Sequence, residues 1–433
     1  MVETLSLRRL PLPVLVVCLL LWPIARTAAQ RASTSLEGTA TDASGSVVAQ
    51  ATVRLTSVET GYARTAATNE AGTYAFPDLT PGKYSITAEA KGFKTTVIEN
   101  LTLYVGPPVV QDIKFELGTV SEQVSVTATS PLLRQSTAEI GTVISDKALT
   151  ELPLNGRNFL QLNQLTPGVI RSKNGGTFDD VQINPTAQGF DTNGSRMDYN
   201  VYLLDGVNIK EYQHGSNMYS PSVDAIQEFN QGTSNYGAAF GSESGAQVSV
   251  VTKAGTNQYH GDLYDFMRNN NLDARNFFEL AHHPGPYHRN QFGGTFGGPV
   301  EIPKLYNGKD KTFFFLSYEG FRDSRQTPEL GYFPTAQQLG GNLSDLVAPG
   351  GKPVVDPVSG VPYPNNTIPA SQIPSTLTTF LQSGIGKGPW LPLPNTSGPG
   401  YNYFRDSAYR FDNDQVIARV DQKLGNNTFL YGT

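Results

Sequence analysis

Cysteine is almost missing from this chain of 433 residues, since the only one is Cys18. Because Cys18 lies in the N-terminal apolar segment described below, the remainder can form no disulfide and offers no thiol for catalysis or metal binding. Charged residues are scarce too, at 16%, and the formal net charge is -6. A protein that binds nucleic acid would show a basic face, so nucleic acid is not an expected partner.

Glycine and aromatic residues are plentiful by contrast, with 43 Gly, 20 Tyr and 22 Phe against 2 Trp. This composition favours β-structure with many tight turns. A chain of this length is expected to hold two or three domains. We therefore expect a mainly β protein with several domains.

The first residues have the pattern of a secretory signal. Arg8 and Arg9 precede the apolar run "LPLPVLVVCLLLW", and "RTAAQ" offers a cleavage site after Ala29. The alternative is a membrane anchor, but a spanning helix needs roughly 20 apolar residues. We predict that residues 1–29 are a signal peptide and that the protein is exported.

Residues 30–118 consist of short alternating segments separated by turn signals such as "TDASGSVV" and "TNEAGTYAF". In "LTPGKYSITAEAKGF", Tyr84, Ile86 and Ala88 alternate with polar residues after a Pro-Gly turn. Strands that recur at this spacing predict a small β-sandwich.

Residues 119–253 mix strand and helix patterns, which predicts a small α+β domain. Ser145 can cap a helix over "DKALTEL". In "LPLNGRNFLQLNQLTPGV", Phe159, Leu162 and Leu165 recur at a spacing of three, and a Thr-Pro-Gly sequence follows. We predict a short helix here that packs through this apolar stripe.

Polar residues of the same region are the candidate site residues. Asn155 and Gly156 supply a turn into the helix, and Arg157 and Asn158 are expected to face a hydrated surface. In "YNVYLLDGVNIKEY", the tight-turn dipeptide Asp205-Gly206 predicts a hairpin. In "PSVDAIQEF", we predict another helix, with Ile226 and Phe229 inward.

Residues 254–433 contain five segments of strand composition, "HGDLYDFMRN", "NQFGGTFGGPV", "KTFFFLSYEGF", "DQVIARVDQKL" and "TFLYGT". In the fourth, Val416, Ala418 and Val420 alternate with a polar set, although Ile417 interrupts that set. The polar set is Gln415, Arg419, Asp421 and Lys423. Phe292 and Phe296 likewise share one face. Long and short connections alternate between the segments, as in an outer-membrane barrel.

Together these motifs resemble those of TonB-dependent outer-membrane receptors of the Oar-like type. The marks are "LPLNGRNFLQLNQLTPGV", "YLLDGVN", "PSVDAIQEF", "RNQFGGTFGGPV" and "KTFFFLSYEGFR". Residues 30–118 resemble a carboxypeptidase regulatory-like domain of transthyretin-like, carbohydrate-binding-like fold. The resemblance implies that 119–253 form a plug domain and that 254–433 begin an antiparallel outer-membrane β-barrel.

The barrel is expected to be incomplete. Transporter barrels of this class have 22 strands, and at about 10 residues each they need roughly 220 residues before any loop. Only 180 residues follow position 253. We expect the first five strands or so of a longer receptor.

The resemblance also implies a mechanism in the outer membrane of a Gram-negative bacterium. The expected partners are the TonB–ExbB–ExbD energising complex, outer-membrane lipid, and a small ligand such as a siderophore, cobalamin or a glycan. The candidate TonB box is the extended segment Glu122, Gln123, Val124, Ser125, Val126 and Thr127. The alternative is that this segment is the last strand of the preceding sandwich.

No enzymatic activity, catalytic site, metal or cofactor is expected. His282, His283 and His288 cluster in "AHHPGPYH", but no carboxylate or thiol is spaced to complete a metal site. Two other functions stay open. One is a secreted or surface-attached β-sandwich that binds or adheres, and the more remote one is an exported hydrolase with a regulatory-like domain.

Overall fold

The computed structural model describes most of the chain, in two compact units that are considered separately below. The described residues are 33–106, 108–119, 123–127, 139–172, 189–213, 215–237, 243–274, 286–383, 392–398, 400–425 and 428–433. The first unit comprises Met1–Leu263, Gly293–Glu319 and Gln415–Thr433, and the second comprises Tyr264–Phe292 and Gly320–Asp414. Among the described residues, no helix is both long and apolar enough to cross a membrane.

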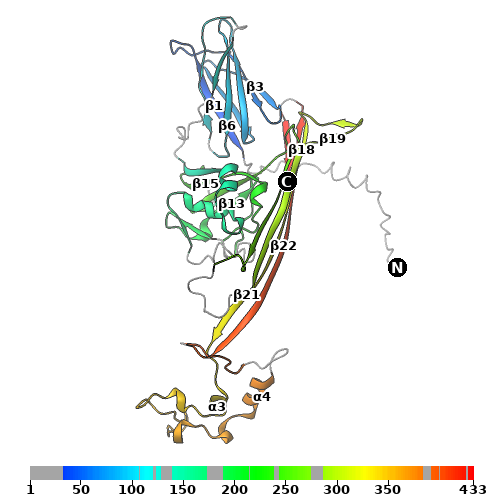
Figure 1. Ribbon diagram of the computed structural model, residues 1–433. Helices are drawn as coiled ribbons and strands as arrows, with labels where there is room; N and C mark the ends of the chain where they lie inside the picture. The colour runs from blue at the N-terminus through cyan, green and yellow to red at the C-terminus, as the bar shows by residue number, and fades with distance from the viewer. Residues whose placement is uncertain are drawn as a thin grey trace, which may run out of the picture. The chain divides into compact units, whose positions relative to one another are not determined.

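The N-terminal domain is a β-sandwich, drawn in blue to cyan in Figure 1. One sheet contains β4 (Thr73–Leu79), β1 (Thr34–Thr41), β7 (Val109–Val110) and β8 (Ile113–Lys114). The other has the order β3 (Ala63–Ala67), β2 (Thr52–Ser57), β5 (Gly82–Glu89), β6 (Thr95–Leu103) and β9 (Gln123–Thr127). The predicted sandwich is thus confirmed, including the inward set Tyr84, Ile86 and Ala88, which are at most 5% exposed.

The middle domain, residues 139–253, is built on a second sheet. Its order is β10 (Ile140–Ser145), β15 (Ile226–Ser234), β16 (Gln247–Thr252), β13 (Val201–Leu204) and β14 (Val207–Asn208). A small separate sheet pairs β11 (Val169–Arg171) with β12 (Phe190–Thr192). The helical elements are α2 (Asp146–Glu151) and the 3-10 turns η1 (Asn155–Arg157), η2 (Phe159–Leu165), η5 (Met197–Tyr199) and η6 (Val223–Ala225). The domain is therefore α+β, as predicted.

Two helix predictions for this domain need correction. "PSVDAIQEF" forms only the single turn η6, and Ile226 and Phe229 are buried within strand β15. Pairing of β15 with both β10 and β16 outweighs the local helical pattern. In η2, Phe159 is buried but Leu165, at the last position before the turn, is 61% exposed. Ser145 is the residue before α2, yet its side chain makes no capping hydrogen bond.

The C-terminal sheet contains the five predicted strands in chain order. They are β17 (His260–Asn269), β18 (Tyr287–Pro299), β21 (Thr312–Gly331), β22 (Tyr403–Leu424) and β23 (Thr428–Gly432). The long curved ribbons of β21 and β22 are yellow to red in Figure 1. They have 20 and 22 residues, about twice the length predicted from composition.

The connections of this sheet hold elements that the sequence did not predict. A small hairpin, β19 (Glu301–Ile302) and β20 (Tyr306–Asn307), lies in the short connection between β18 and β21. The long connection between β21 and β22 contains α3 (Ala336–Leu339), η8 (Ser344–Leu346), η9 (Pro364–Asn366), η10 (Ala370–Gln372) and α4 (Ser375–Ser383). A capping box between Thr335 and Gln338 begins α3.

Strand β22 confirms the predicted alternation of faces. Val416 and Val420 are 64% and 51% exposed, whereas Arg419 and Asp421 are 2% and 1% exposed. Ile417, the exception in the pattern, is buried on the polar face. A sheet that exposes its apolar side chains and buries its charged ones has the inverse of a soluble protein's pattern, and this is the pattern of a membrane barrel wall.

Candidate functional site

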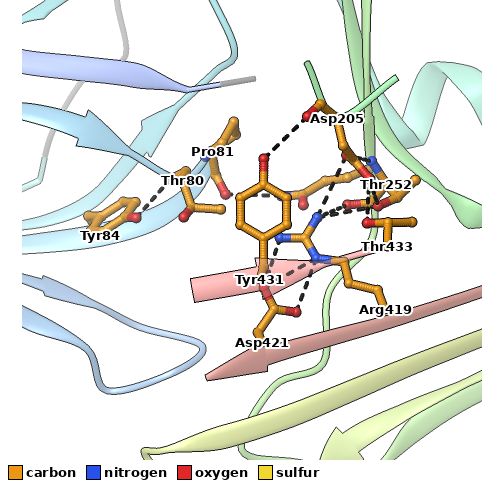
Figure 2. A network of polar contacts seen from close by, with 10 residues as sticks. Thr80, Pro81, Tyr84, Asp205, Thr252, Arg419, Asp421, Tyr431 and Thr433 are labelled. Atoms are coloured by element: carbon orange, nitrogen blue, oxygen red, sulfur yellow. Dashed lines mark hydrogen bonds and ion pairs between the residues drawn. The ribbon is translucent and has the colours of Figure 1, made fainter. Parts of the chain in front are cut away.

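The polar face of the C-terminal sheet meets the middle domain at Arg419 (Figure 2). The Nε and Nη2 atoms of Arg419 donate to the Asp421 carboxylate at 3.0 and 2.9 Å. Its Nη1 atom donates to the backbone carbonyl of Thr252, at the end of β16, at 3.1 Å. One guanidinium therefore links a strand of the sheet to a strand of the middle domain.

The hairpin turn at Asp205 completes this network. Asp205 and Gly206 have φ of 48° and 87°, the positive values that a two-residue turn of this kind requires. The Asp205 carboxylate accepts hydrogen bonds from the backbone N–H and the hydroxyl of Thr252, at 2.9 and 2.7 Å. It also lies 3.8 Å from Nη1 of Arg419. The predicted hairpin is confirmed, and its aspartate faces the C-terminal sheet.

Strand β23 approaches the same turn from the sheet. The Tyr431 hydroxyl donates to the Asp205 carbonyl at 3.3 Å, and the Thr433 hydroxyl donates to the Asp205 carboxylate at 2.8 Å (Figure 2). The Tyr431 ring centroid is 4.5 Å from the Arg419 guanidinium carbon. Planar stacking and forked hydrogen bonding are properties of arginine that lysine does not share. We call Asp205, Thr252, Arg419, Asp421 and Tyr431 the junction network.

A small apolar cluster supports the network. Ala225 of the middle domain packs with Phe315 and Ile417 of the C-terminal sheet, and Tyr219 lies against them. Burial, followed by the nearby Glu319 carboxylate, raises the pKa of Tyr219 to about 12. The contact between the middle domain and the C-terminal sheet is thus partly apolar and buried, and burial strengthens the ion pairs beside it.

The remaining predicted plug residues have structural roles within the middle domain. Gly156 has φ of 63° and supplies the turn, as predicted. Arg157 does not face a hydrated surface, because its guanidinium forms an ion pair with Asp224 and both side chains are at most 13% exposed. Asn158 is 1% exposed and its side chain accepts the Leu160 N–H at the start of η2. The prediction for Arg157 and Asn158 was therefore wrong, since the turn directs both inward.

The candidate TonB box lies at the edge of the N-terminal sandwich. Gln123–Thr127 form β9, which pairs in parallel with β6, so that Ser125 stands opposite Val97. Val126 is 47% exposed. Glu122, His282 and His283 lie outside the described residues. This placement is the one expected from a last strand of the sandwich, and a role as TonB box stays a prediction.

Another buried carboxyl group, that of Glu228 in β15, was not predicted from the sequence. It is 5% exposed, and its carboxylate accepts the backbone N–H of Val105. Burial raises the pKa of Glu228 to about 7, the Val105 hydrogen bond opposes this, and Asp146 adds to it. Only its position in a strand, which the sequence pattern did not show, would have marked it as buried.

Comparison with known proteins agrees with this architecture. Residues 251–433 match the outer membrane beta barrel domain, and residues 35–116 match the carboxypeptidase regulatory-like domain. The two matches therefore identify a regulatory-like domain and an outer-membrane β-barrel domain in separate parts of the chain.

Over a longer stretch the chain also resembles a known transporter. It is similar to the TonB-dependent transporter Oar of Myxococcus xanthus, with 24% identity over 307 residues. The match covers 67% of this chain and 27% of that transporter. The predicted resemblance to Oar-like TonB-dependent transporters is confirmed.

Solved structures with local similarity include two outer-membrane proteins. The outer membrane transporter YddB from Escherichia coli is 12% identical, with a TM-score of 0.36 over 65% of this chain and 30% of its own. The siderophore receptor PirA from Acinetobacter baumannii is 18% identical, with a TM-score of 0.30 over 43% and 28%.

Proposed function

We propose that this chain acts in energised uptake of a scarce small ligand across the outer membrane, with the middle domain as the plug. The junction network carries the proposal. A plug must be held in the barrel yet be able to move. A few buried polar contacts that can be exchanged for water meet both needs better than an extensive apolar interface does.

In this proposal the energised partner is TonB with ExbB and ExbD, and it acts on residues 122–127. An extended edge strand can add to the sheet of a partner through main-chain hydrogen bonds, with little demand on side chains. Ser125 and Val126 are exposed in β9, so that edge is reachable. The role is transport, and no step requires catalysis by this chain.

The segment can be tested with a peptide of residues 122–129 and the C-terminal domain of the host TonB. We expect saturable binding, and we expect Val124→Pro to weaken it because proline removes a main-chain donor. Lys94→Ala, outside the peptide, serves as the control in the full-length protein. Absence of peptide binding, together with uptake that is unchanged by Val124→Pro in the full-length receptor, would exclude the assignment.

A further inference from the structure

The short connection between β18 and β21 exposes apolar side chains where a turn usually has polar ones. It folds into the β19–β20 hairpin, which stands out from the end of the C-terminal sheet (Figure 1). Leu305 of this hairpin is 80% exposed, and Ile302 and Tyr306 are 47% and 39% exposed. Turns between strands favour glycine, asparagine, aspartate and serine. An apolar surface at such a place indicates contact with something other than water.

The turn of the hairpin also holds a lysine in a conformation that lysine disfavours. The Leu305 N–H donates to the Ile302 carbonyl at 3.0 Å and closes the turn. Pro303 is the first central residue of this turn and Lys304 is the second. Lys304 has φ of 65°, a value at which glycine or asparagine is the usual residue. Strain of this kind is typical of a residue whose side chain has a function.

Hydrogen bonds place the base of the hairpin on the exposed apolar face of the sheet. The Tyr306 hydroxyl bonds with the hydroxyl of Thr312 on β21, and the Thr312 hydroxyl donates to the Gln422 side chain on β22 at 2.7 Å. Side chains two positions apart in a strand share a face, so Gln422 shares the face of the exposed Val420. On β21, Leu316 has the parity of Thr312 and is 47% exposed. The hairpin therefore begins where the apolar face ends.

Aromatic rings border the hairpin on this face. The rings of Tyr259 and Phe296 are stacked with centroids 6.0 Å apart, and the centroid of Phe314 lies 5.5 Å from that of Phe296. The Tyr259 hydroxyl donates to the Glu301 carboxylate at 3.2 Å. Tyr259 and residues 301–307 line an open hollow of about 580 Å³. The hollow thus combines aromatic and aliphatic walls with the turn lysine.

The charges of the connection favour an anionic group beside this apolar surface. It contains three lysines, Lys304, Lys309 and Lys311, and two carboxylates, Glu301 and Asp310. Nζ of Lys309 lies 3.7 Å from the Glu301 carboxylate, so these two charges compensate each other. An anionic phospholipid matches the arrangement, because its phosphate can meet a lysine while its glycerol and acyl carbons meet apolar side chains.

We propose that the β19–β20 hairpin is a phospholipid headgroup site at the periplasmic rim of the barrel. Ile302, Leu305 and Tyr306 enter the boundary between headgroups and acyl chains, and Lys304 meets the phosphate. Short connections of outer-membrane barrels lie on the periplasmic side, and cations beside aromatic and aliphatic groups are the composition of an interfacial anchor.

This site is distinct from the aromatic girdle that outer-membrane barrels share, because it depends on one hairpin and on one lysine in a strained turn. It goes beyond the proposed uptake. It rests only on the outer-membrane barrel domain that residues 251–433 match, and not on the energised step.

A fluorescent label on the hairpin tests the proposal, because the only native cysteine is Cys18. The full chain with Cys18→Ser and Leu305→Cys is labelled with the dye NBD in detergent micelles. A phospholipid that carries a nitroxide on its headgroup is then added, and we expect it to quench the label saturably. Unlabelled phosphatidylglycerol should relieve the quenching, uncharged diacylglycerol should relieve it less, and inorganic phosphate should not relieve it.

The matched label is placed by Val358→Cys. Val358 is also an aliphatic residue in a turn and is 95% exposed, but it belongs to the long connection between β21 and β22. A label at this position should not be quenched. The comparison separates a lipid site from exposure alone.

Lys304→Gly, made in the labelled chain, tests the turn lysine. It should raise the Tm, because glycine adopts positive φ without strain. It should nevertheless weaken phosphatidylglycerol binding about fivefold, the effect of one lysine at a lipid surface. Lys352→Gln, at an exposed lysine of the long connection, should change neither quantity.

Three results would overturn the proposal. The first is no quenching at position 305 or equal quenching at 305 and 358, the second is relief by inorganic phosphate as strong as by phosphatidylglycerol, and the third is equal effects of Lys304→Gly and Lys352→Gln on binding. Failure of the residue 122–129 peptide to bind TonB would instead count against the energised step alone.

Discussion

Arg419 shows how a single residue can join two parts of this chain. Its hydrogen bonds reach Asp421 in its own strand and Thr252 in the middle domain, and its guanidinium is stacked by Tyr431. A buried arginine with this set of partners is compensated in charge and in hydrogen bonding. Removing it leaves two buried carboxylates without their cation, which is more unfavourable than losing the pair as a whole.

We therefore expect Arg419→Ala to lower the free energy of unfolding by about 3–5 kcal/mol. Urea denaturation in detergent, followed by circular dichroism, measures this. The control is Arg322→Ala, whose ion pair with Asp414 is 34% and 52% exposed and should contribute about 1 kcal/mol or less. Equal effects of the two substitutions would contradict a special role for the junction network.

Glu228 makes stability depend on pH. Its pKa in the folded protein is about 7, above its usual 4.5, because it is buried. Between these values the folded state holds a proton that the unfolded state has released. The contribution of Glu228 to stability is therefore fully present below pH 4.5 and is lost as pH rises through about 7.

Glu228→Gln should remove this dependence, because glutamine keeps an oxygen for the Val105 N–H and carries no charge. The loss of unfolding free energy between pH 4.5 and 8 should shrink by at most about 3 kcal/mol, since each pKa unit corresponds to 1.36 kcal/mol. Melting temperatures of the unsubstituted chain and of Glu228→Gln, measured between pH 4.5 and 8, test this prediction. Parallel curves for both would show that Glu228 is not the titrating group.

At the scale of the element, the C-terminal half of β22 has an exposed apolar face and a buried polar face, and in the proposed transporter the apolar face would contact lipid. Val420 is 51% exposed on the apolar face. Asp412 lies on the same face, eight residues nearer the start of the strand, and carries a charge. The apolar band ends between them. A charge should accordingly be tolerated at one position and not at the other.

Val420→Arg should destabilise the chain folded in lipid vesicles by about 2–4 kcal/mol, and Asp412→Arg by about 0–1 kcal/mol, since the penalty of arginine falls from the midplane to the interface. Reversible unfolding from vesicles measures both. In water-soluble form, Val420→Arg would have no reason to destabilise, so a penalty that appears without lipid would argue against a lipid-facing position.

Much of the fold could be predicted at this scale, because period-two patterns and Asp-Gly turns are local signals. The strands of the sandwich, the hairpin at Asp205 and the two faces of β22 are of this kind. Strand β15, where a helix was predicted at Ile226, could not be predicted in this way. Its pairing with β10 and β16, which are distant in sequence, determines its structure. Local sequence patterns cannot predict the junction network, since Thr252 and Arg419 are 167 residues apart in sequence.

Inward placement of Arg157 was also beyond the sequence pattern. A polar residue after a turn is usually solvated, and only the position of Asp224 in the folded domain makes a buried ion pair available. The sequence did place Arg419 and Asp421 on the polar face of their strand. It could not show that this face is buried against the hairpin.

At the scale of the whole molecule, the chain contains separate apolar cores. The core of the sandwich includes Leu36, Phe76, Ile86 and Phe115, all at most 1% exposed, and none of these belongs to the core of the middle domain. A domain with its own core can fold alone. Strand β9 differs from the other strands of the sandwich because it follows them in sequence after a gap. The last sandwich residue before it that forms a β-bridge is Leu117.

A polypeptide of residues 33–127 should therefore fold and be more stable than one of residues 33–119. The longer one includes β9, which pairs with β6 over five residues, from Thr95 opposite Gln123 to Glu99 opposite Thr127. Cross-strand pairs contribute roughly 0.2–1 kcal/mol each, so five pairs should add at least about 1 kcal/mol. For a domain of this size each kcal/mol corresponds to a rise in Tm of roughly 4–8 °C.

The matched control carries Ser125→Pro in the 33–127 polypeptide. Proline lacks the main-chain donor that a parallel strand needs, so the Tm of the substituted polypeptide should fall back to that of residues 33–119.

A TonB domain added to the 33–127 polypeptide has to compete with β6 for β9 if TonB binds the edge of β9 that pairs with β6. In that case binding should be weaker than to the free 122–129 peptide and should improve when β6 is weakened by Val97→Pro. Equal affinity for the peptide and the 33–127 polypeptide would show that TonB uses the open edge of β9 and leaves the sandwich sheet intact.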